Sequence, residues 1–431
     1  MRRRHDSGQQ NSPRRNRIKS THPHATGRAS IFSPDIAVIG AGPAGCTVAS
    51  TAAELGADVL MLEEHPLPGL PVFCGEAVTV ETLAAVGIKP EPPIINEPIR
   101  KLNIYAPNGK HVTISNDKVL GYTINRDVFD GLLADKAVAS GVTLMVNAKA
   151  EEVTKKNGIV VGVKAEHHVE TLLIKSKIVI GADGHASMVR RSALGIPYFK
   201  SFAVCAQYTL TGLDIQEPDA IEVWLGRKYA PGGYAWVFPK SRTVANVGVG
   251  VRQDQATKPA LLYLQGFISQ NPNLREGIII HKTGGICPVT GTLDKIVDDG
   301  VMLVGDAAGQ TIPMTGAGVE SAIHAGKMAG RVASKAIQEG DTSKTRLEEY
   351  PETFNHHWGK LMENSKRTLN IFDALNDEDL NKVSEIITPE QVKSLVYGEK
   401  VLRNFVPLAF RAPRPALKIL RARAVMLSAL W

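Results

Sequence analysis

Three acidic side chains and one cysteine occupy positions from which they could contact a bound ligand. Glu63, Asp183 and Asp306 each follow an apolar run of strand type, and Asp183 and Asp306 are also flanked by glycine. A carboxylate at the end of a strand can accept hydrogen bonds from the hydroxyl groups of a ribose or another polyol. Cys74 lies in a loop over residues 64–80 that is rich in proline and glycine, where a thiol could donate a proton.

The first of these acids ends a glycine-rich pattern. A strand-type run over 36–39 leads into Gly40-x-Gly42-x-x-Gly45, a helix-type segment follows, and a second apolar run ends at Glu63. Gly40 allows a tight turn, Gly42 lets the backbone approach a pyrophosphate, and Gly45 lets the helix pack on the strand. The helix N-terminus then directs unpaired N–H groups at the phosphates. The pattern predicts a dinucleotide-binding site.

An aromatic stretch later in the chain could contact an apolar substrate. In a strand, Tyr234, Trp236 and Phe238 project from one face because side chains alternate. Gly248 and Gly250 on a returning strand would leave a slot beside this wall. A long apolar chain needs such a slot, since each buried CH₂ contributes about 0.8 kcal/mol. An aromatic cluster inside an ordinary sheet core is the alternative.

Regular elements must position these residues. Two hairpins with Asn-Gly turns, at 108–109 and 157–158, are predicted on either side of an amphipathic helix over 127–140. Residues 200–290 have mostly the pattern of antiparallel strands, and the chain from about 343 has a helical pattern.

Composition limits the class of protein. No apolar run approaches ~20 residues, so no transmembrane helix is expected. The four cysteines have no Cys-x-x-Cys spacing, which argues against zinc, iron–sulfur or disulfide frameworks and predicts no metal site. This cysteine usage favours a reducing, intracellular setting.

Charge is concentrated at the two ends. The net charge of +7 equals that of residues 1–34, which we interpret as a disordered basic tail. With a neutral remainder and no nucleic-acid motif, nucleic-acid binding is not predicted. After Glu399 the chain has seven basic residues and no acid, interspersed with apolar residues at roughly helical spacing. Such a segment suits an anionic membrane surface, or a helix packed on the body with a solvated basic face.

Together these motifs resemble FAD-containing oxidoreductases of the glutathione-reductase/hydroxybenzoate-hydroxylase superfamily. There the first motif binds the ADP half, and a late motif like Gly305-Asp306-Ala307-Ala308-Gly309 binds the ribitol chain. Tyr234-x-Trp236-x-Phe238-Pro239 followed by Gly248-x-Gly250 looks like the signature of geranylgeranyl reductases, which carry a cysteine near the isoalloxazine, here in Phe73-Cys74-Gly75. The resemblance covers residues 35–430 and is strongest to archaeal digeranylgeranylglycerophospholipid reductases.

The resemblance implies site residues. The cofactor contacts would be Gly40, Gly42, Ala44, Gly45, Glu63, Cys74, Gly75, Arg126, Ala148, Asp306, Gly318 and Val319. Arg126 could hold a phosphate bidentately. The substrate contacts would be Tyr234, Trp236, Phe238, Pro239, Gly248 and Gly250. Asp183 is interpreted mainly as structural.

The implied fold class is α/β, a Rossmann-type FAD-binding domain with an inserted antiparallel-sheet substrate domain and a helical C-terminal region. The FAD-binding domain would comprise 35–100, 115–197 and 291–342. The substrate domain would comprise 101–114 and 198–290, and the helical region, a candidate for membrane association, would be 343–431.

The implied activity is FAD-dependent saturation of C=C bonds in the geranylgeranyl chains of a prenylated glycerophospholipid. Alternatives are a chlorophyll-pathway geranylgeranyl reductase, a flavin-dependent aromatic monooxygenase, or a quinone-linked electron-transfer flavoprotein. Electron-transfer flavoproteins of that last type carry a four-cysteine iron–sulfur module near the C-terminus, and the last cysteine of this chain is Cys287. The electron donor stays open between ferredoxin, a deazaflavin and NADPH. A cytoplasmic enzyme, peripheral on the inner face of the cell membrane, is expected.

Three roles are open for Cys74. Its backbone could contact the flavin while the side chain only packs, its thiol could donate the second proton of the reduction, or it could pair with Cys287 in a disulfide.

Overall fold

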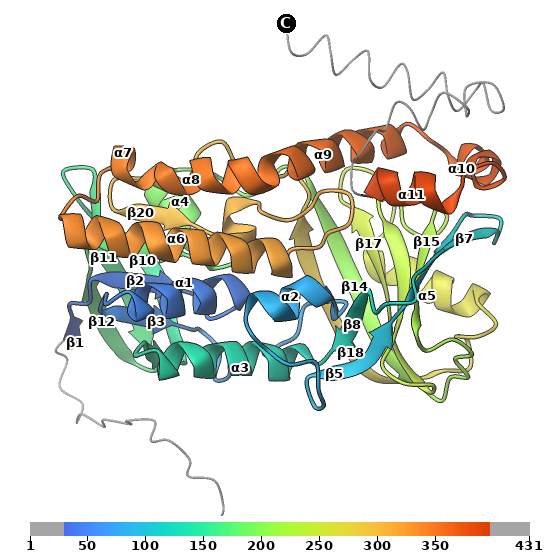
Figure 1. Cartoon of the computed structure of the whole chain (residues 1–431), viewed down its shortest axis with the longest axis horizontal. Helices are drawn as coiled ribbons and strands as arrows, with labels where there is room; N and C mark the ends of the chain where they lie inside the picture. The colour runs from blue at the N-terminus through green and yellow to red at the C-terminus, as the bar shows by residue number, and fades with distance from the viewer. Residues whose placement is uncertain (1–29, 397–431) are drawn as a thin grey trace, which may run out of the picture.

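The glycine-rich segment forms the predicted strand–helix–strand unit in the computed structural model, which describes residues 30–396. β2 and β3 pair in parallel, joined by α1 (Figure 1). They belong to a six-stranded sheet whose strands are parallel except β19. In spatial order these are β19 (Val297–Asp298), β20 (Val301–Leu303), β13 (Ile178–Gly181), β2 (Ile36–Ile39), β3 (Val59–Leu62) and β9 (Thr143–Met145).

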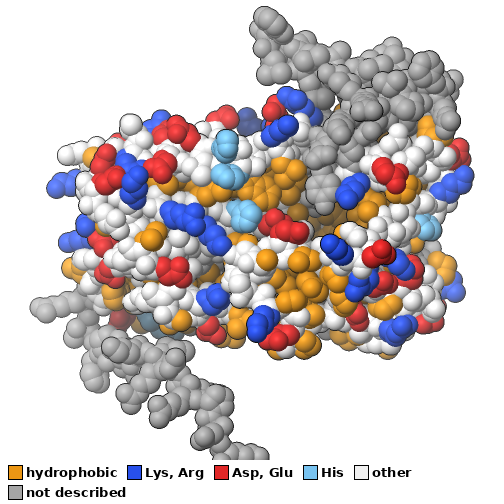
Figure 2. Space-filling view, in the orientation of Figure 1, with side chains coloured by type: hydrophobic (Ala, Val, Ile, Leu, Met, Phe, Trp, Pro, Cys, Tyr) orange, Lys and Arg blue, Asp and Glu red, His pale blue; other side chains and the backbone are white. Residues whose placement is uncertain are grey.

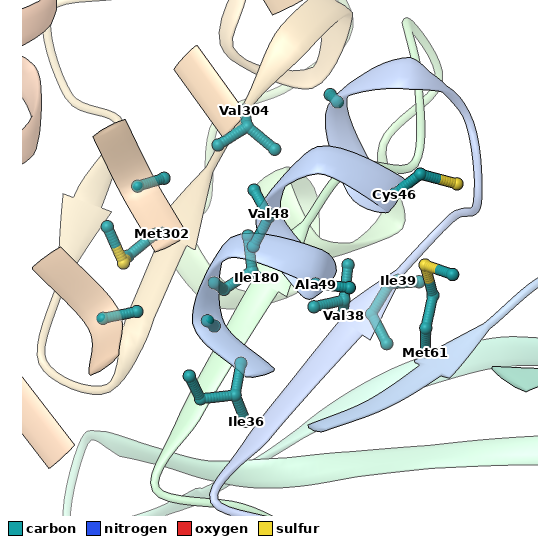
Figure 3. Packing of buried hydrophobic residues seen from close by; sticks show 14 of the residues in the cluster. Ile36, Val38, Ile39, Cys46, Val48, Ala49, Met61, Ile180, Met302 and Val304 are labelled. Carbon is teal, nitrogen blue, oxygen red and sulfur yellow. The ribbon is translucent and has the colours of Figure 1, made fainter. Parts of the chain in front are cut away.

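The core of this half is built on the central strands. Every residue of β2, β3 and β13 is buried, as continuous apolar runs in a parallel sheet require. In Figure 3, Val48 and Ala49 of α1 face Val38 and Ile180 of the sheet, with Val304 beside them. Glycines let α6 approach α1 closely, since a Cβ on Gly326 would lie 2.8 Å from the Ala44 carbonyl oxygen.

Helices cover this sheet and extend beyond it. Figure 1 shows α8 and α9 following one another along one edge of the molecule, with α6 running beside α8 and α9 reaching towards the second half. The helices are α1 (Pro43–Glu54), α2 (Val80–Ala85), α3 (Arg126–Ala139), α4 (Met188–Leu194), α5 (Ala260–Gln270), α6 (Val319–Glu339), α7 (Lys344–Leu347), α8 (Glu349–Phe354), α9 (Lys360–Asp373), α10 (Asp377–Ser384) and α11 (Pro389–Val396), with a 3-10 turn η1 (Gly305–Ala308) and a π-helical turn η2 (Asn355–Gly359).

A seven-stranded sheet forms the second half of the molecule. Its strands in spatial order are β18 (Ile278–Pro288), β14 (Phe202–Thr211), β17 (Val244–Arg252), β16 (Tyr234–Pro239), β15 (Ala220–Leu225), β6 (Lys101–Tyr105) and β7 (His111–Ser115). All neighbours are antiparallel except β15 and β6. The predicted hairpin at 108–109 is confirmed as β6–β7 and forms one edge of this sheet.

Two smaller sheets complete the fold. One contains β1 (Ser30–Phe32), β12 (Glu170–Lys175), β11 (Ile159–His167) and β10 (Ala148–Lys156), and it confirms the hairpin at 157–158. The other contains β4 (Ala77–Thr79), β8 (Gly121–Ile124) and β5 (Ile95–Ile99).

Two expectations about elements were wrong, and one helix was not predicted. Residues 30–32, assigned to the basic tail, form β1, which pairs in parallel with β12. Residues 77–79, assigned to the loop, form β4 because they pair with β8. Residues 260–270 form α5, whose residues Leu264 and Phe267 pack into the core of the seven-stranded sheet. The basic and apolar C-terminal segment, and most of the N-terminal tail, lie outside the described residues.

Candidate active site

The glycine-rich turn is shaped as its sequence predicts. Gly40 has φ of 99°, which an L side chain rarely adopts, and a Cβ on Gly45 would lie 1.9 Å from the Gly40 carbonyl oxygen. Gly42 is the N-cap residue of α1 and differs from both, because a Cβ placed there would meet no protein atom within 4 Å. The space over Gly42, at the helix N-terminus, is therefore open to a ligand phosphate.

Glu63 lies beside this turn. Its Oε2 accepts a hydrogen bond from the backbone N–H of Ala41 at 2.8 Å, and its Oε1 lies 2.6 Å from His65 Nδ1. The side chain is buried, and the backbone N–H of Ala148 donates to the Glu63 carbonyl at 2.8 Å. Ala148, at the start of β10, is thus placed next to the acid, and its predicted contact with the cofactor stays a prediction.

Asp306 lies in η1, directly after β20. Its Oδ1 accepts from the Thr311 hydroxyl at 3.2 Å, and a Cβ on Gly318 would lie 3.3 Å from the same oxygen. Gly318 is the N-cap residue of α6, so this helix directs its N-terminus towards the carboxylate. Burial raises the pKa of the Asp306 carboxyl above its ordinary 3.8, against the opposing effects of Thr311, His185 and Arg126.

The late motif touches the early one. A Cβ on Gly305 would lie 3.0 Å from the Ala44 Cβ in the first turn of α1. Val319 is the first residue of α6. The N-termini of α1 and α6 therefore lie on the same side of the six-stranded sheet, with Asp306 beside them.

The loop before β4 that carries Cys74, here called the cysteine loop (residues 64–76), crosses the face of the seven-stranded sheet. The Cys74 carbonyl accepts a hydrogen bond from Gln207 Nε2 at 3.0 Å, and Trp236 Nε1 donates to Gln207 Oε1 at 2.9 Å. A Cβ on Gly75 would lie 2.8 Å from the Phe238 ring. Gln207 on β14 therefore ties an aromatic residue of β16 to the backbone of the cysteine loop.

A buried acid fixes the end of this loop. Glu76 has φ of 67° and is 7% exposed. Its Oε2 accepts from Lys240 Nζ and from Asn246 Nδ2, each at 2.7 Å, and its Oε1 accepts from the backbone N–H of Arg126 at 2.9 Å. Because these donors come from both halves of the molecule, Glu76 holds the loop at the junction between them.

The aromatic stretch forms a row, as its alternation predicts. The Trp236 ring centroid lies 5.9 Å from that of Tyr234 and 6.1 Å from that of Phe238. The buried Pro239 ends β16, and its carbonyl accepts from the Thr123 hydroxyl at 2.6 Å. The Tyr234 hydroxyl donates to the Thr315 carbonyl, just before α6. The row thus joins the cysteine loop at one end and the approach to α6 at the other.

The expected slot over the paired glycines was wrong. β16 and β17 pair so that Trp236 is opposite Gly248 and Tyr234 is opposite Gly250. A Cβ on Gly248 would lie 2.2 Å from the Trp236 ring, and one on Gly250 would lie 3.7 Å from the same ring. The glycines therefore make room for the indole itself, because a side chain at Gly248 would overlap it.

Arg126 is held by an acid on its own helix. Its guanidinium binds Asp130 bidentately, at 2.8 and 2.7 Å, and its predicted contact with the cofactor stays a prediction. Burial opposes its charge, but Asp130 and the neighbouring Cys74 raise its pKa above the ordinary value. The pair lies one helical turn apart on α3, which favours it over a more distant anion.

The surroundings of Asp183 and Cys74 bear on the roles proposed for them. Asp183 Oδ2 accepts from the Val189 backbone N–H at 3.0 Å at the start of α4, which agrees with a structural role. All four cysteines are free thiols, so the Cys74–Cys287 disulfide is not formed in this structure. The Cys74 Sγ instead accepts from the Glu76 backbone N–H at 3.2 Å.

A pocket opens next to Tyr234, where the two halves and the C-terminal helices meet. Its lining is mainly apolar at Leu225, Met314, Leu369, Phe372, Leu375 and Leu380, with Arg227, Gln255 and Asp373 among its polar residues. Figure 2 shows hydrophobic side chains gathered around the middle of this view of the molecule.

FAD fits this arrangement. The open space over Gly42 suits a pyrophosphate, Glu63 can accept from a ribose, and Asp306 can accept from a ribitol hydroxyl. The fold and the site together define an FAD-dependent oxidoreductase.

Comparison with known proteins specifies the family. Residues 35–199 match the family model for FAD-dependent oxidoreductases, and residues 201–287 match the geranylgeranyl reductase catalytic domain. Digeranylgeranylglycerophospholipid reductase 2 of Methanopyrus kandleri is 36% identical over 88% of this chain and 96% of its own length. The corresponding reductase of Methanosarcina acetivorans is 37% identical over 90% and 95%. The chain belongs to the digeranylgeranylglycerophospholipid reductase group of the geranylgeranyl reductase family.

Solved structures agree with this. A geranylgeranyl bacteriochlorophyll reductase-like protein from Thermoplasma acidophilum superposes with a TM-score of 0.82 at 30% identity, covering 91% of this chain and 100% of its own. The flavin-dependent brominase Bmp2 has a TM-score of 0.66 at 18% identity, covering 92% of this chain and 100% of its own, which shows a shared fold alone.

Sequence reasoning missed the polar residues that hold the cysteine loop. Gln207, Asn246, Lys240 and Glu76 carry no family motif used above. A signal existed for two of them, because Gln207 and Asn246 each interrupt a strand that is otherwise mostly apolar. A buried amide on a strand needs hydrogen-bond partners, so its position indicates a polar contact across the sheet.

Proposed function

We propose that this chain is an FAD-dependent reductase that saturates the C=C bonds of geranylgeranyl chains carried on a glycerophospholipid. The observation that carries the proposal is the aromatic row of Tyr234, Trp236 and Phe238, which is hydrogen-bonded through Gln207 to the cysteine loop of the cofactor half. The relatives described above carry this activity in their names and match nearly the whole chain.

The two halves have separate tasks in this proposal. The half built on the six-stranded sheet holds FAD through the turn at Gly40–Gly45, Glu63 and Asp306. When bound, FAD supplies the hydride for the reduction. The half built on the seven-stranded sheet holds the prenyl chain against the aromatic row, with the pocket beside Tyr234 receiving the remainder of the chain. Burial of the chain's CH₂ groups provides the affinity, because each buried CH₂ contributes about 0.8 kcal/mol of binding free energy.

The aromatic row also keeps water from the reacting bond. Trp236 is 7% exposed, and its only polar atom is satisfied by Gln207, so the surface it offers is apolar. Exclusion of water protects a reduced flavin from side reactions and strengthens its contacts with fixed dipoles such as the N-terminus of α6. Cys74 contributes its backbone at this surface, with its sulfur held by the Glu76 N–H.

Peripheral attachment to a membrane is part of the proposal. Within residues 30–396 no helix has the length and apolar character needed to cross a bilayer. A substrate with two C20 chains resides in lipid, so the enzyme must reach it from the membrane surface.

The test is direct product analysis. The purified FAD-loaded protein is supplied with dithionite and digeranylgeranylglyceryl phospholipid in detergent, and the lipid is examined by mass spectrometry. The proposal predicts a mass gain of two hydrogens for each saturated bond. Unchanged lipid, with FAD fully bound and reduced, would refute it.

A further inference from the structure

One edge of the seven-stranded sheet carries exposed apolar side chains. β18 has its hydrogen-bonding partner β14 on one side, and it is the last strand of the sheet on the other. Ile278 is 65% exposed and Ile280 58%, and Phe73 of the cysteine loop is 62% exposed. Natural edge strands are usually protected by charges or by covering segments, so an apolar edge indicates a contact surface.

The cysteine loop is attached to this edge. The Thr283 hydroxyl of β18 donates to the Val72 carbonyl at 2.6 Å. A Cβ on Gly285 would lie 3.3 Å from the Phe73 Cβ. At the C-terminal end of β18 the ladder with β14 continues, since the Val289 backbone N–H donates to the Ser201 carbonyl at 3.3 Å, which places Ser201 beside that end of the strand.

Acidic residues are absent from all three segments. Residues 66–75, 195–213 and 277–293 contain no Asp or Glu, although acids make up 43 of the 431 residues of the chain. Exposed cations are present instead, at Lys200 and Lys282. The exposed Tyr198 stacks under the guanidinium of Arg191 at 4.4 Å, adding an aromatic ring with a cation beside it.

We infer that this edge, defined by Phe73, Tyr198, Lys200 and the exposed residues of β18, docks on the surface of an anionic lipid bilayer. Exposed Ile, Phe and Tyr combine here with Lys200 and Lys282, and the exposed Glu276 just before β18 is paired with Arg275 at 3.3 Å. Such a surface complements a negatively charged interface. A second copy of this chain, pairing β18 with β18, fits the charge pattern less well, because Lys282 would approach its own copy.

The inference rests on the proposed function for its choice of a lipid surface. It adds to that function which edge of the molecule faces the membrane. Phe73 directly precedes Cys74, so docking at this edge places the mouth of the active site on the membrane. The prenyl chain would then leave the bilayer beside the aromatic row without crossing water.

The test uses the full-length, FAD-loaded chain and sedimentation with phosphatidylglycerol vesicles, compared with phosphatidylcholine vesicles. The variant combines Ile278→Thr, Ile280→Thr and Lys282→Glu, which keep β-branched residues on the strand. Loss of apolar area and reversal of one charge should weaken binding to the anionic vesicles roughly tenfold or more. The matched control, Ile159→Thr, Val169→Thr and Lys156→Glu, alters exposed positions on the four-stranded sheet and should bind as the unmodified chain does.

Equal vesicle binding by the variant and the unmodified chain would overturn the inference. So would a dimer in sedimentation velocity that the variant dissociates, because a second copy would then cover the edge. If the triple variant loses FAD or unfolds, Lys282→Glu alone, at an exposed position, answers the same question. Turnover of detergent-dispersed lipid separates the two proposals, because it should be equal in the variant and the unmodified chain. Its absence from both refutes the proposed function and leaves the vesicle result standing.

Discussion

The two large sheets place functional residues in different ways. In the six-stranded sheet, the site consists of turns at strand ends, and each turn is a short motif whose residues follow one another along the chain, as Gly40 to Gly45 do. In the seven-stranded sheet, Gln207 and Trp236 meet only because β14, β17 and β16 pair in a particular register. A local motif therefore describes the first half, whereas the second half depends on pairing between distant segments.

The largest expected effect contrasts two glycines in one turn. Gly45→Ala should destabilise the protein by about 3 kcal/mol or more, because its Cβ would overlap the Gly40 carbonyl oxygen and the backbone must shift. Gly42→Ala should fold normally, because its Cβ meets no protein atom, and should bind FAD at least about tenfold more weakly by filling the phosphate space. Urea unfolding and FAD titration measure the two effects. If Gly42→Ala binds FAD with normal affinity, no phosphate of FAD occupies the space over Gly42.

A second contrast concerns two tryptophans on neighbouring strands. Trp236→Phe leaves the Gln207 amide oxygen without its donor and loosens the cysteine loop, so we expect turnover to fall about tenfold with FAD retained. Trp224→Phe is the matched control, since Trp224 bonds Glu222 at 2.8 Å and stacks on Tyr105 away from the loop. Steady-state turnover and bound FAD are measured for both. Equal loss of FAD and turnover in Trp236→Phe would make Trp236 a core residue only.

A third prediction separates stability from cofactor binding in the parallel half. Burial raises the pKa of Asp306, so ionisation is less favourable in the folded protein than in the unfolded chain. The free energy of unfolding of the FAD-free protein should therefore fall as pH rises through the window between the ordinary value of 3.8 and the raised value. Asp306→Asn removes this penalty and should raise the thermal midpoint at pH 7, while it weakens FAD binding through loss of the anionic acceptor.

Differential scanning calorimetry of both proteins without FAD, at pH 4 and pH 7, measures the stability effect. A lower midpoint for Asp306→Asn at pH 7 would show that the carboxylate supports the fold instead of the cofactor.

The smallest expected effect is at the junction of the halves. Cys74→Ser should change turnover by less than about threefold, because the Cys74 carbonyl keeps its bond to Gln207 and a hydroxyl can accept from the Glu76 N–H. Proton donation by the thiol predicts instead a fall of about 10²-fold with FAD bound. Single-turnover kinetics with equal FAD content distinguish the two roles.

Prediction from sequence succeeded where side-chain spacing alone carries the information. The shape of the turn follows from its glycines, and the aromatic row follows from strand periodicity. The cofactor roles of Glu63 and Asp306 came from the family resemblance and stay predictions. The slot over Gly248 was mispredicted because the size of a cavity depends on what packs across it, here the Trp236 ring. The ion pair of Arg126 with Asp130 was not predicted either, since sequence does not say which of several acceptors a guanidinium will bind.

Helix α5 shows the same limit in the fold. Its residues Ala260 to Gln270 lie in the stretch that we predicted to be mostly antiparallel strands without placing a helix, and burial against the seven-stranded sheet decides in favour of a helix. Tertiary packing overrides a short local pattern in such cases.

Anaerobic reaction of the reduced protein with its proposed substrate tests the central claim most directly. The FAD-loaded protein is reduced without oxygen and mixed with digeranylgeranylglyceryl phospholipid, while flavin absorbance and lipid mass are followed together. The account predicts that the oxidised flavin spectrum returns without oxygen, with one C=C bond saturated for each flavin reoxidised. Flavin that stays reduced until oxygen is admitted, with a lipid of unchanged hydrogen content, would contradict it.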